Sequence, residues 1–357
     1  MKRIHNFSAG PAVLPESVIE EVKQDLFSFQ GSGIGIMEMS HRSSLFDGIL
    51  DEVEQSFKIL LNLPANYKIL FCTGGATQQF SMLALNLSLK DKPANYIVSG
   101  EWAKKAYQEA KRFVDVHIAG SSEEIKFKNL PKQLNLTPES SYLHFTSNNT
   151  LYGTQYKSEP ESGNHLLVCD ASSDFLHKPL DLSKYGLIYA SSQKNLGPAG
   201  VTVVIIREDL LERTPNNLAL NLDYKLFAKN RSLYNTPPTF PIYVMGKVLK
   251  WLINSGGLEK RQLLNAKKAQ LLYDFIDNSK IYHGVADKEC RSVMNVTFRM
   301  KTEEMEKDFL NQAEASGFSG LTGHRSVGGV RASIYNAFPV EGIAALIEFM
   351  KDFEKKQ

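Results

Sequence analysis

Short apolar runs alternate with amphipathic helical patterns along most of this 357-residue chain. The runs at residues 142–145 and 166–169 lack the regular polar alternation of a half-exposed strand, which is typical of strands covered on both faces. Strands of this kind, separated by helices, form the parallel sheet of an α/β fold. We therefore predict an α/β fold whose large domain is built on a mostly parallel central sheet.

The pattern changes at Ser255-Gly256-Gly257, where a long helical segment begins. Beyond it, apolar strands at residues 294–298 and 330–334 are interspersed with helices, which is typical of a smaller α+β unit. We predict an N-terminal segment that packs at the functional site or on the small domain, then a large domain, then a small C-terminal α+β domain. Their predicted bounds are 1–15, 16–257 and 258–357.

The large domain is predicted to begin with a helix that opens at Pro15, because proline suits the first helical turn. Ile19, Val22, Leu26 and Phe29 follow at helical spacing. We predict that these four residues form the buried face of the helix.

Composition excludes several classes of function. Charged residues make up 22% of the chain and the formal net charge is +2, so nothing indicates a nucleic acid or an anionic membrane as partner. No segment is apolar and long enough to span a bilayer, and the first residues do not form a signal peptide. Cys72, Cys169 and Cys290 fit no metal or disulfide spacing, and we expect buried thiols in a cytoplasmic protein without a metal site.

The segment Thr73-Gly74-Gly75-Ala76-Thr77 follows a predicted strand and opens a helix. Backbone N–H groups at such a helix start can bind a phosphate, although a tight turn without a ligand has the same pattern. Open α/β sheets bind ligands at the carboxyl ends of their strands, and this position favours a binding site.

Two charged residues follow later strands. Asp170 ends an apolar strand, where a carboxylate is costly to bury unless it caps the next turn or pairs with a cation such as a protonated pyridine nitrogen. Lys194 lies in Ser192-Gln193-Lys194-Asn195-Leu196-Gly197-Pro198, among small and uncharged residues. Desolvation lowers the pKa of a lysine and makes its amine a nucleophile and a base, although most lysines are simply solvated at the surface.

Asp170 together with residues 192–200 resembles the core of the fold-type-I pyridoxal-phosphate aminotransferases of class V. Within that group the chain resembles the phosphoserine aminotransferase family. The stretches that carry this second resemblance are 6–12, 37–43, 234–240 and 323–336. The resemblance implies reversible transamination between phosphoserine and 2-oxoglutarate in serine biosynthesis, with pyridoxal 5′-phosphate as cofactor.

The resemblance also implies which residues bind the cofactor. Lys194 would form a Schiff base with it and later move the proton between substrate and cofactor, Asp170 would face the pyridinium nitrogen, and Trp102 would stack on the ring. The other implied contacts are Ala76, Thr77, Thr150 and Gln193, with Asn235 and Thr236 reaching the cofactor phosphate from the second subunit. A homodimer with shared active sites is therefore implied.

For the substrate, the resemblance assigns the α-carboxylate to Arg331, whose guanidinium matches a carboxylate with two parallel hydrogen bonds. It assigns Ser8 as the substrate contact from the N-terminal segment. The residues implied for the phosphate of phosphoserine, or for the distal carboxylate of glutamate, are His41, Arg42, His324 and Arg325. Thr77 departs from the family pattern, because several members have arginine there. This departure leaves the affinity for the substrate phosphate open, and with it the use of 4-phosphohydroxy-threonine in pyridoxine biosynthesis.

Two other functions are weighed against this hypothesis. Another class V activity, alanine–glyoxylate transamination or cysteine desulfuration, is disfavoured because no cysteine lies in a Gly/Ser-rich loop and small substrates do not require two His-Arg pairs. A catalytically inactive relative that serves as a binding module is disfavoured because both Lys194 and Asp170 are present.

Overall fold

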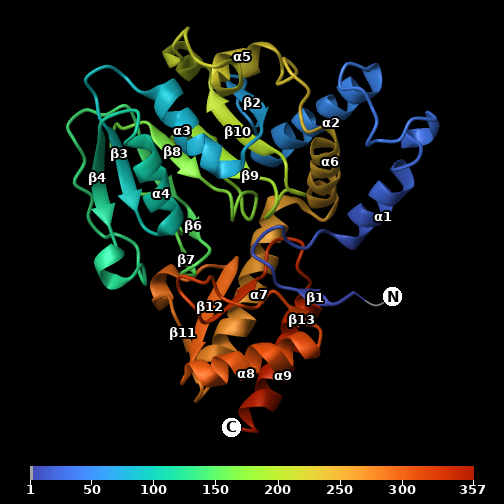
Figure 1. Cartoon of the computed structure of the whole chain (residues 1–357), viewed down its shortest axis with the longest axis vertical. Helices are drawn as coiled ribbons and strands as arrows, with labels where there is room; N and C mark the ends of the chain where they lie inside the picture. The colour runs from blue at the N-terminus through green and yellow to red at the C-terminus, as the bar shows by residue number, and fades with distance from the viewer. Residues whose placement is uncertain (1–2) are drawn as a thin grey trace.

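The computed structural model describes residues 3–357 and contains a seven-stranded sheet with the strand order β2-β10-β9-β8-β5-β3-β4 (Figure 1). The strands are β2 (Tyr67–Cys72), β3 (Ala94–Val98), β4 (Val116–Ser121), β5 (Leu143–Thr146), β8 (Leu167–Asp170), β9 (Leu187–Ser191) and β10 (Thr202–Arg207). Neighbouring strands are parallel except that β10 runs antiparallel to both β9 and β2. The predicted α/β fold with a mostly parallel sheet is confirmed.

Helices cover both faces of this sheet. The helices of this part are α1 (Glu16–Asp25), α2 (Ser44–Leu61), α3 (Gly75–Leu87), α4 (Glu101–Ala110), α5 (Tyr224–Lys229) and α6 (Thr239–Asn254). In β8, Val168 packs in the core beside α3 and α4, whereas Cys169 packs in the core beside α2 and α6. Because strand residues alternate between faces, Asp170 points to the same side as Val168.

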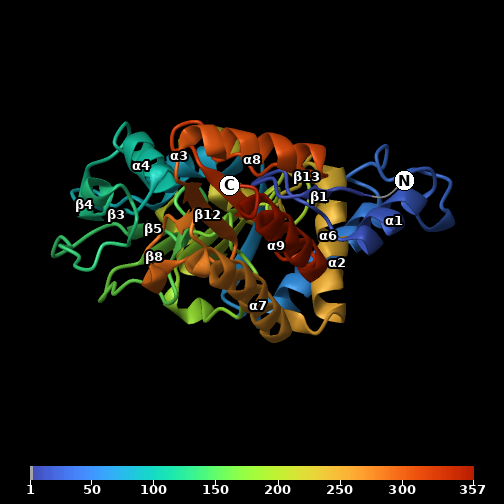
Figure 2. The same ribbon diagram turned by 90° about the horizontal axis from the view of Figure 1, so that it is seen from below.

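A second, smaller sheet follows, with the order β11-β12-β14. Its strands are β11 (Tyr282–Gly284), β12 (Asn295–Met300) and β14 (Val330–Ser333), and its helices are α7 (Gly257–Asn278), α8 (Glu303–Ala315) and α9 (Val340–Glu354). The three helices and the sheet share one apolar core, and they lie toward the viewer in Figure 2. The bounds proposed for the domains stay a prediction.

The N-terminal segment joins the two sheets. β1 (His5–Asn6) pairs in parallel with β13 (Phe318–Ser319), and Phe7 is buried in the core of the smaller part. A few residues later Ala12 N donates to Gln193 O at 2.9 Å. The segment therefore runs from the smaller part to the loop that carries Lys194.

The predicted buried face of α1 is wrong, although the helix begins directly after Pro15 as expected. Val18 is fully buried, whereas Ile19 and Leu26 are 37% and 42% exposed. The helix contacts α6, Val18 is its only buried residue, and it ends at Asp25. Leu26 and Phe29 therefore fall outside the helix, and Phe29 reaches the core from a separate 3-10 turn.

Two cations of α7 hold the segment that precedes α9. Lys268 is 1% exposed, and its Nζ donates to three carbonyl oxygens within residues 334–338, at 2.6 to 3.2 Å. Arg261 donates to Asn336 O at 2.9 Å and lies 4.3 Å from the ring centroid of Trp251. These contacts fix the backbone around Tyr335, which lies near the site described below.

Two expectations from composition are addressed directly by the structure. Cys72, Cys169 and Cys290 are buried and free, as predicted. No helix within residues 3–357 is long and apolar enough to cross a membrane.

Candidate active site

The carboxyl ends of β2, β3, β5, β8 and β9 meet at one edge of the large sheet. Cys72 and Ser191, which end β2 and β9, both pair with Thr202, and Asp170 ends the neighbouring β8. The residues that follow these strand ends include Ala76, Thr77, Trp102, Thr150, Gln193 and Lys194. The fold therefore brings most of the predicted cofactor residues to the edge where open α/β sheets bind ligands.

Lys194 lies half-buried in the short connection between β9 and β10. Its Nζ donates to Ala9 O at 3.3 Å. Burial lowers the pKa of Lys194 to about 8; the charge of Asp170 opposes this shift, and the charge of Arg331 adds to it. At neutral pH a pKa in this range leaves roughly a tenth of the amine unprotonated, far more than for a solvated lysine.

Asp170 is almost fully buried at the end of β8. Its Oδ1 accepts a hydrogen bond from Ser172 N at 2.9 Å, so the carboxylate caps the turn that follows the strand. Burial raises the pKa of Asp170, whereas the hydrogen bond from Ser172 and the charge of Lys194 lower it. The carboxylate therefore both caps a turn and interacts with the nearby amine.

The start of α3 is tied to the strand that precedes Lys194. Ala76 N donates to Ser191 Oγ at 2.7 Å. Gly74 and Gly75 have φ values of 77° and 66°, which only glycine adopts readily, so the turn depends on both glycines. Thr77 is exposed in the first turn, where backbone N–H groups other than that of Ala76 suit a phosphate.

Trp102 lies in the first turn of α4 and is held by two contacts. Its Nε1 donates to Thr150 Oγ1 at 3.3 Å, and Lys105 Nζ lies 4.6 Å from the centroid of the indole ring. Thr150 is buried directly after β6 (Asn148–Asn149), which pairs with β7 (Thr154–Gln155). The indole is therefore oriented by both α4 and the segment that follows β5.

A group of cations lies around Arg331, whose charge also acts on Lys194. Arg331 is half-buried in β14, its Nε has no hydrogen-bond partner, and it forms no ion pair within residues 3–357. Burial lowers the pKa of His324, and the charges of Arg331 and Arg325 lower it further, which places these three side chains close together. A guanidinium without an anionic partner in a half-buried position is suited to a carboxylate or phosphate ligand.

Four other predicted residues are not joined to this group within one chain. His41 and Arg42 lie between α1 and α2 and form no described contact with Lys194. Asn235 and Thr236 precede α6 and are both exposed. Within the residues that the structure describes, a single chain therefore assembles only part of the predicted site.

Comparisons with known proteins identify the family. Residues 4–346 match the family described as Aminotransferase class-V. A curated phosphoserine aminotransferase of Lysinibacillus sphaericus is 50% identical to this chain over 99% of each sequence. The chain belongs to the phosphoserine aminotransferase family of class-V aminotransferases.

Solved structures of the family have the same fold. A phosphoserine aminotransferase from Bacillus circulans subsp. alkalophilus is 48% identical with a TM-score of 0.98, and the match covers 100% of this chain and 99% of that one. A phosphoserine aminotransferase from Trichomonas vaginalis, solved with bound PLP, is 36% identical with a TM-score of 0.92 over 98% and 100% of the two chains.

In this aminotransferase, sequence reasoning missed two residues at Lys194. Ala9 O accepts from Lys194 Nζ and also from Tyr335 Oη, the latter at 2.8 Å. Both residues lie inside the stretches that carry the family resemblance, 6–12 and 323–336. Alanine offers no functional side chain, and Tyr335 is 326 positions away from Ala9, so no local pattern could join them.

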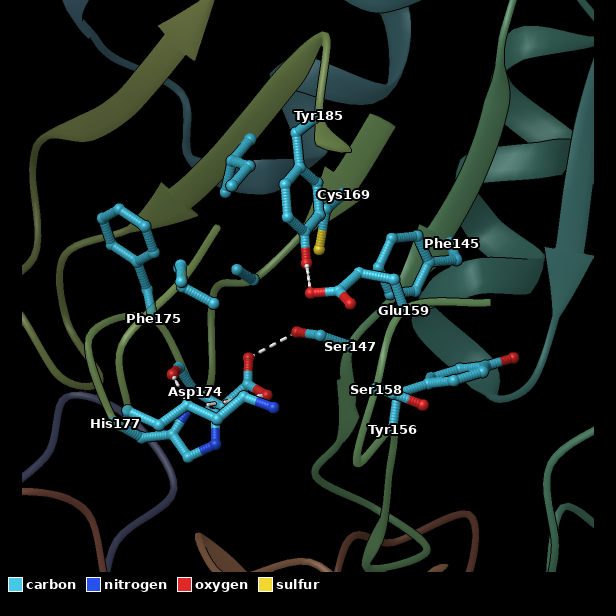
Figure 3. Close-up of a pocket in the computed structure, with 14 residues that line it drawn as sticks. Phe145, Ser147, Tyr156, Ser158, Glu159, Cys169, Asp174, Phe175, His177 and Tyr185 are labelled. Atoms are coloured by element: carbon cyan, nitrogen blue, oxygen red, sulfur yellow. Dashed lines mark hydrogen bonds and ion pairs between the residues drawn. The ribbon is translucent and has the colours of Figure 1, made fainter. Parts of the chain in front are cut away.

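A small cavity lies beneath the same strand ends, on the face covered by α2 and α6 (Figure 3). Its volume is about 30 Å³, enough for roughly one water and too small for a cofactor. Ser147 connects it to the site, because its Oγ hydrogen-bonds both Asp174 and, at 3.2 Å, Asp170 O. In this class-V aminotransferase Ser147 therefore supports the end of β8, and the cavity is separate from the ligand site.

Proposed function

We propose that this enzyme transfers an amino group between O-phospho-L-serine and 2-oxoglutarate, giving 3-phosphohydroxypyruvate and L-glutamate, for L-serine biosynthesis. One observation carries the proposal: the amine of Lys194 follows β9 and the buried carboxylate of Asp170 ends the neighbouring parallel strand β8, while the charge of Arg331 also acts on Lys194. The substrate follows from relatives about half identical over their whole length that are named phosphoserine aminotransferase.

Pyridoxal 5′-phosphate is the cofactor of this enzyme, and the residues at the edge of the sheet fit it. An amine with a lowered pKa suits its aldehyde, and a buried carboxylate at Asp170 suits its ring nitrogen. The N–H groups at the start of α3 and the hydroxyl of Thr77 suit its phosphate, while Trp102 offers a flat ring. When bound, the cofactor supplies an electron sink for the amino-bearing carbon of the substrate.

Lys194 would hold the cofactor and then carry the proton. Its Nζ would take the proton from the α-carbon of the amino donor. In the second half of the reaction it would give a proton to the α-carbon of the amino acid that is formed from the 2-oxo acid. The lowered pKa of Lys194 favours the neutral form that this step needs. Asp170 would keep the ring nitrogen protonated, because an adjacent carboxylate stabilises the cationic form of that nitrogen.

Arg331 would bind the α-carboxylate shared by both amino acids, with Ser8 as a contact from the N-terminal segment. His324 and Arg325, beside Arg331, would bind the distal anion, which is a phosphate in phosphoserine and a carboxylate in glutamate. Each substrate carries two anionic groups at its two ends, so each requires two groups of cations. The net charge of the chain is only +2, so these cations must be concentrated at the site.

A homodimer would complete the site. A second copy could supply the predicted contacts that form no hydrogen bond or ion pair with Lys194 within residues 3–357, which are His41, Arg42, Asn235 and Thr236. The segment that leads to His41 also exposes large apolar side chains, with Phe27 91% and Met37 68% exposed. Side chains of this kind on a water-facing segment favour a protein interface.

The reaction is tested with purified protein, pyridoxal phosphate, glutamate and 3-phosphohydroxypyruvate. Formation of phosphoserine and 2-oxoglutarate is expected. Serine, alanine and 4-phosphohydroxy-threonine are compared as amino donors, and a preference for alanine over phosphoserine would reject the assignment.

The shared site is tested by mixing two inactive variants, Lys194→Ala and Asn235→Ala. If Asn235 acts in the partner's site, mixed dimers regain one intact site and up to about a quarter of the activity returns. A mixture that stays as inactive as its components, despite subunit exchange, would contradict the shared site.

A further inference from the structure

The hydroxyl of Tyr335 is buried and held by two hydrogen bonds. Asn295 Nδ2 donates to Tyr335 Oη at 3.2 Å, and Tyr335 Oη donates to Ala9 O at 2.8 Å. Tyr335 is 1% exposed, so no bulk water competes for these bonds. The hydroxyl hydrogen therefore points at the carbonyl oxygen of Ala9.

The amide of Asn295 sets this direction. Its Oδ1 accepts from Asn148 Nδ2 at 2.8 Å, and its Nδ2 also donates to Ser333 Oγ at 2.9 Å. With Oδ1 occupied as an acceptor, Asn295 presents an N–H to the tyrosine. Tyr335 is left as the donor toward Ala9, and the connection runs from β6, in the two-stranded sheet with β7, through β12 to the N-terminal segment.

The side chain of Ala9 is a methyl group, which forms no hydrogen bond and cannot orient the carbonyl of this residue. The next residue, Gly10, has a φ of 146°, in a region of backbone conformation that glycine adopts freely. The same carbonyl oxygen accepts from Lys194 Nζ at 3.3 Å. The direction of this carbonyl therefore decides where the amine of Lys194 rests.

We propose that Tyr335 is a positioning residue for Lys194, which it orients through the carbonyl of Ala9. The inference rests on the proposed role of Lys194 as the amine that captures the cofactor. The bond from Lys194 is long, so it directs the free amine without holding it back from reaction. Acceptance by a carbonyl also favours the charged form of the amine.

The test uses cofactor-free, full-length protein and follows the visible absorbance of the lysine-bound cofactor after pyridoxal phosphate is added. Tyr335→Phe removes only the hydroxyl. Tyr282→Phe is the matched control, because Tyr282 is equally buried in the same part of the chain and its hydroxyl also donates to a backbone carbonyl, Met350 O, at 3.0 Å. Both variants lose one buried tyrosine–carbonyl hydrogen bond.

At pH 9, where most of the amine is unprotonated in every variant, Tyr335→Phe is expected to capture the cofactor about tenfold more slowly, the size of effect expected for one hydrogen bond. The pH midpoint of capture is expected to fall by about half a unit, because the charged amine loses its fixed acceptor. Tyr282→Phe is expected to match the wild type in both rate and midpoint. Equal behaviour of the two variants would overturn the proposal.

A second variant keeps the test decisive if Tyr335→Phe folds poorly. Asn295→Asp preserves shape but cannot donate, so the carboxylate would draw the hydroxyl hydrogen of Tyr335 away from Ala9. Slower capture at pH 9 is expected, and a wild-type rate would contradict the inference. The pH midpoint is not compared in this variant, because the added negative charge itself raises the pKa of a nearby amine. Lys194→Ala separates the two proposals, because a lysine-bound absorbance that persists in it rejects the role of Lys194 itself.

Discussion

Two lysines in this enzyme have lowered pKa values for the same first reason, burial, yet their surroundings differ. Burial lowers the pKa of Lys268 to about 7 and that of Lys194 to about 8. Lys268 donates all three of its hydrogens to backbone carbonyls of residues 334–338. Lys194 makes one long hydrogen bond, to Ala9 O, and lies near the carboxylate of Asp170.

The contrast teaches that a lowered pKa alone does not mark a reactive lysine. An amine whose hydrogens are all accepted by fixed carbonyls is a structural cross-link, and an amine with unused hydrogens beside a binding edge is available for chemistry. Two arginines repeat the contrast. Arg261 donates to Asn336 O and Ser255 Oγ and stacks on Trp251, whereas the Arg331 guanidinium makes no hydrogen bond or ion pair within residues 3–357.

The largest effect should come from Lys194→Ala. Transamination is expected to fall by at least about 10³-fold, because both cofactor capture and proton transfer lose their group. The melting temperature of the cofactor-free protein should stay close to that of the wild type, since little hydrogen bonding is lost. Kinetic assays and thermal unfolding measure the two effects, and retained turnover would erase the distinction between the lysines.

Lys268→Met should show the opposite behaviour. Three buried carbonyls lose their donor, and the free energy of unfolding is expected to fall by about 3 kcal/mol. The turnover of the folded fraction should change by less than about twofold. Urea unfolding provides the measurement, and Lys267→Met, at the exposed neighbouring position, is the control. A loss of turnover in fully folded Lys268→Met would mean that both lysines serve the reaction.

Arg331 and Arg261 should also differ, one in substrate binding and the other in stability, but their effects should be smaller than those of the two lysines. Arg331→Leu is expected to raise KM for phosphoserine and for glutamate by about 10- to 100-fold, since each substrate loses a charge-assisted contact to its α-carboxylate. Arg42→Leu should mainly affect the distal anion. Arg261→Leu should lower stability with little effect on KM. Steady-state kinetics with both amino acids distinguish these outcomes, and equal KM values in Arg331→Leu and wild type would remove Arg331 from the substrate site.

The smallest effect concerns stability and pH. In cofactor-free protein the folded pKa of Lys194 is about 8, below the roughly 10.4 of an unfolded lysine. Between these values the unfolded chain binds more protons, so the free energy of unfolding should rise with pH across this window. Lys194→Ala should lose about 1–2 kcal/mol of that rise, after allowance for partial exposure. Urea titrations at several pH values measure the difference, and parallel curves would refute the lowered pKa.

Local sequence patterns could predict the groups that lie close to their own strand ends. Asp170 ends β8, Lys194 follows β9 by three residues, and Ala76 lies in the first turn of the helix after β2, so the alternation of strands and helices placed them at one edge. The resemblance to a known family then assigned their roles. These parts of the site were predictable because strand direction alone determines where the carboxyl ends meet.

Contacts between distant segments could not be predicted in this way. The bond from Tyr335 to Ala9 depends on how the smaller part packs against the N-terminal segment, which no local period records. The burial of Val18 in place of Ile19 depends on the side from which α6 approaches α1. The reversal of β10 likewise depends on pairing with two strands, β2 and β9, that are distant from each other in sequence.

The pairing of β1 with β13 and the bond between Ala9 and Tyr335 have a consequence for synthesis on the ribosome. Residues 5–9 are translated long before their partners at residues 318–319 and 335. The large sheet, which is complete by Arg207, can assemble much earlier, because domains fold as they emerge. A nascent chain that stops before Tyr335 would therefore carry both the amine of Lys194 and the carbonyl of Ala9, but not the hydroxyl that orients this carbonyl.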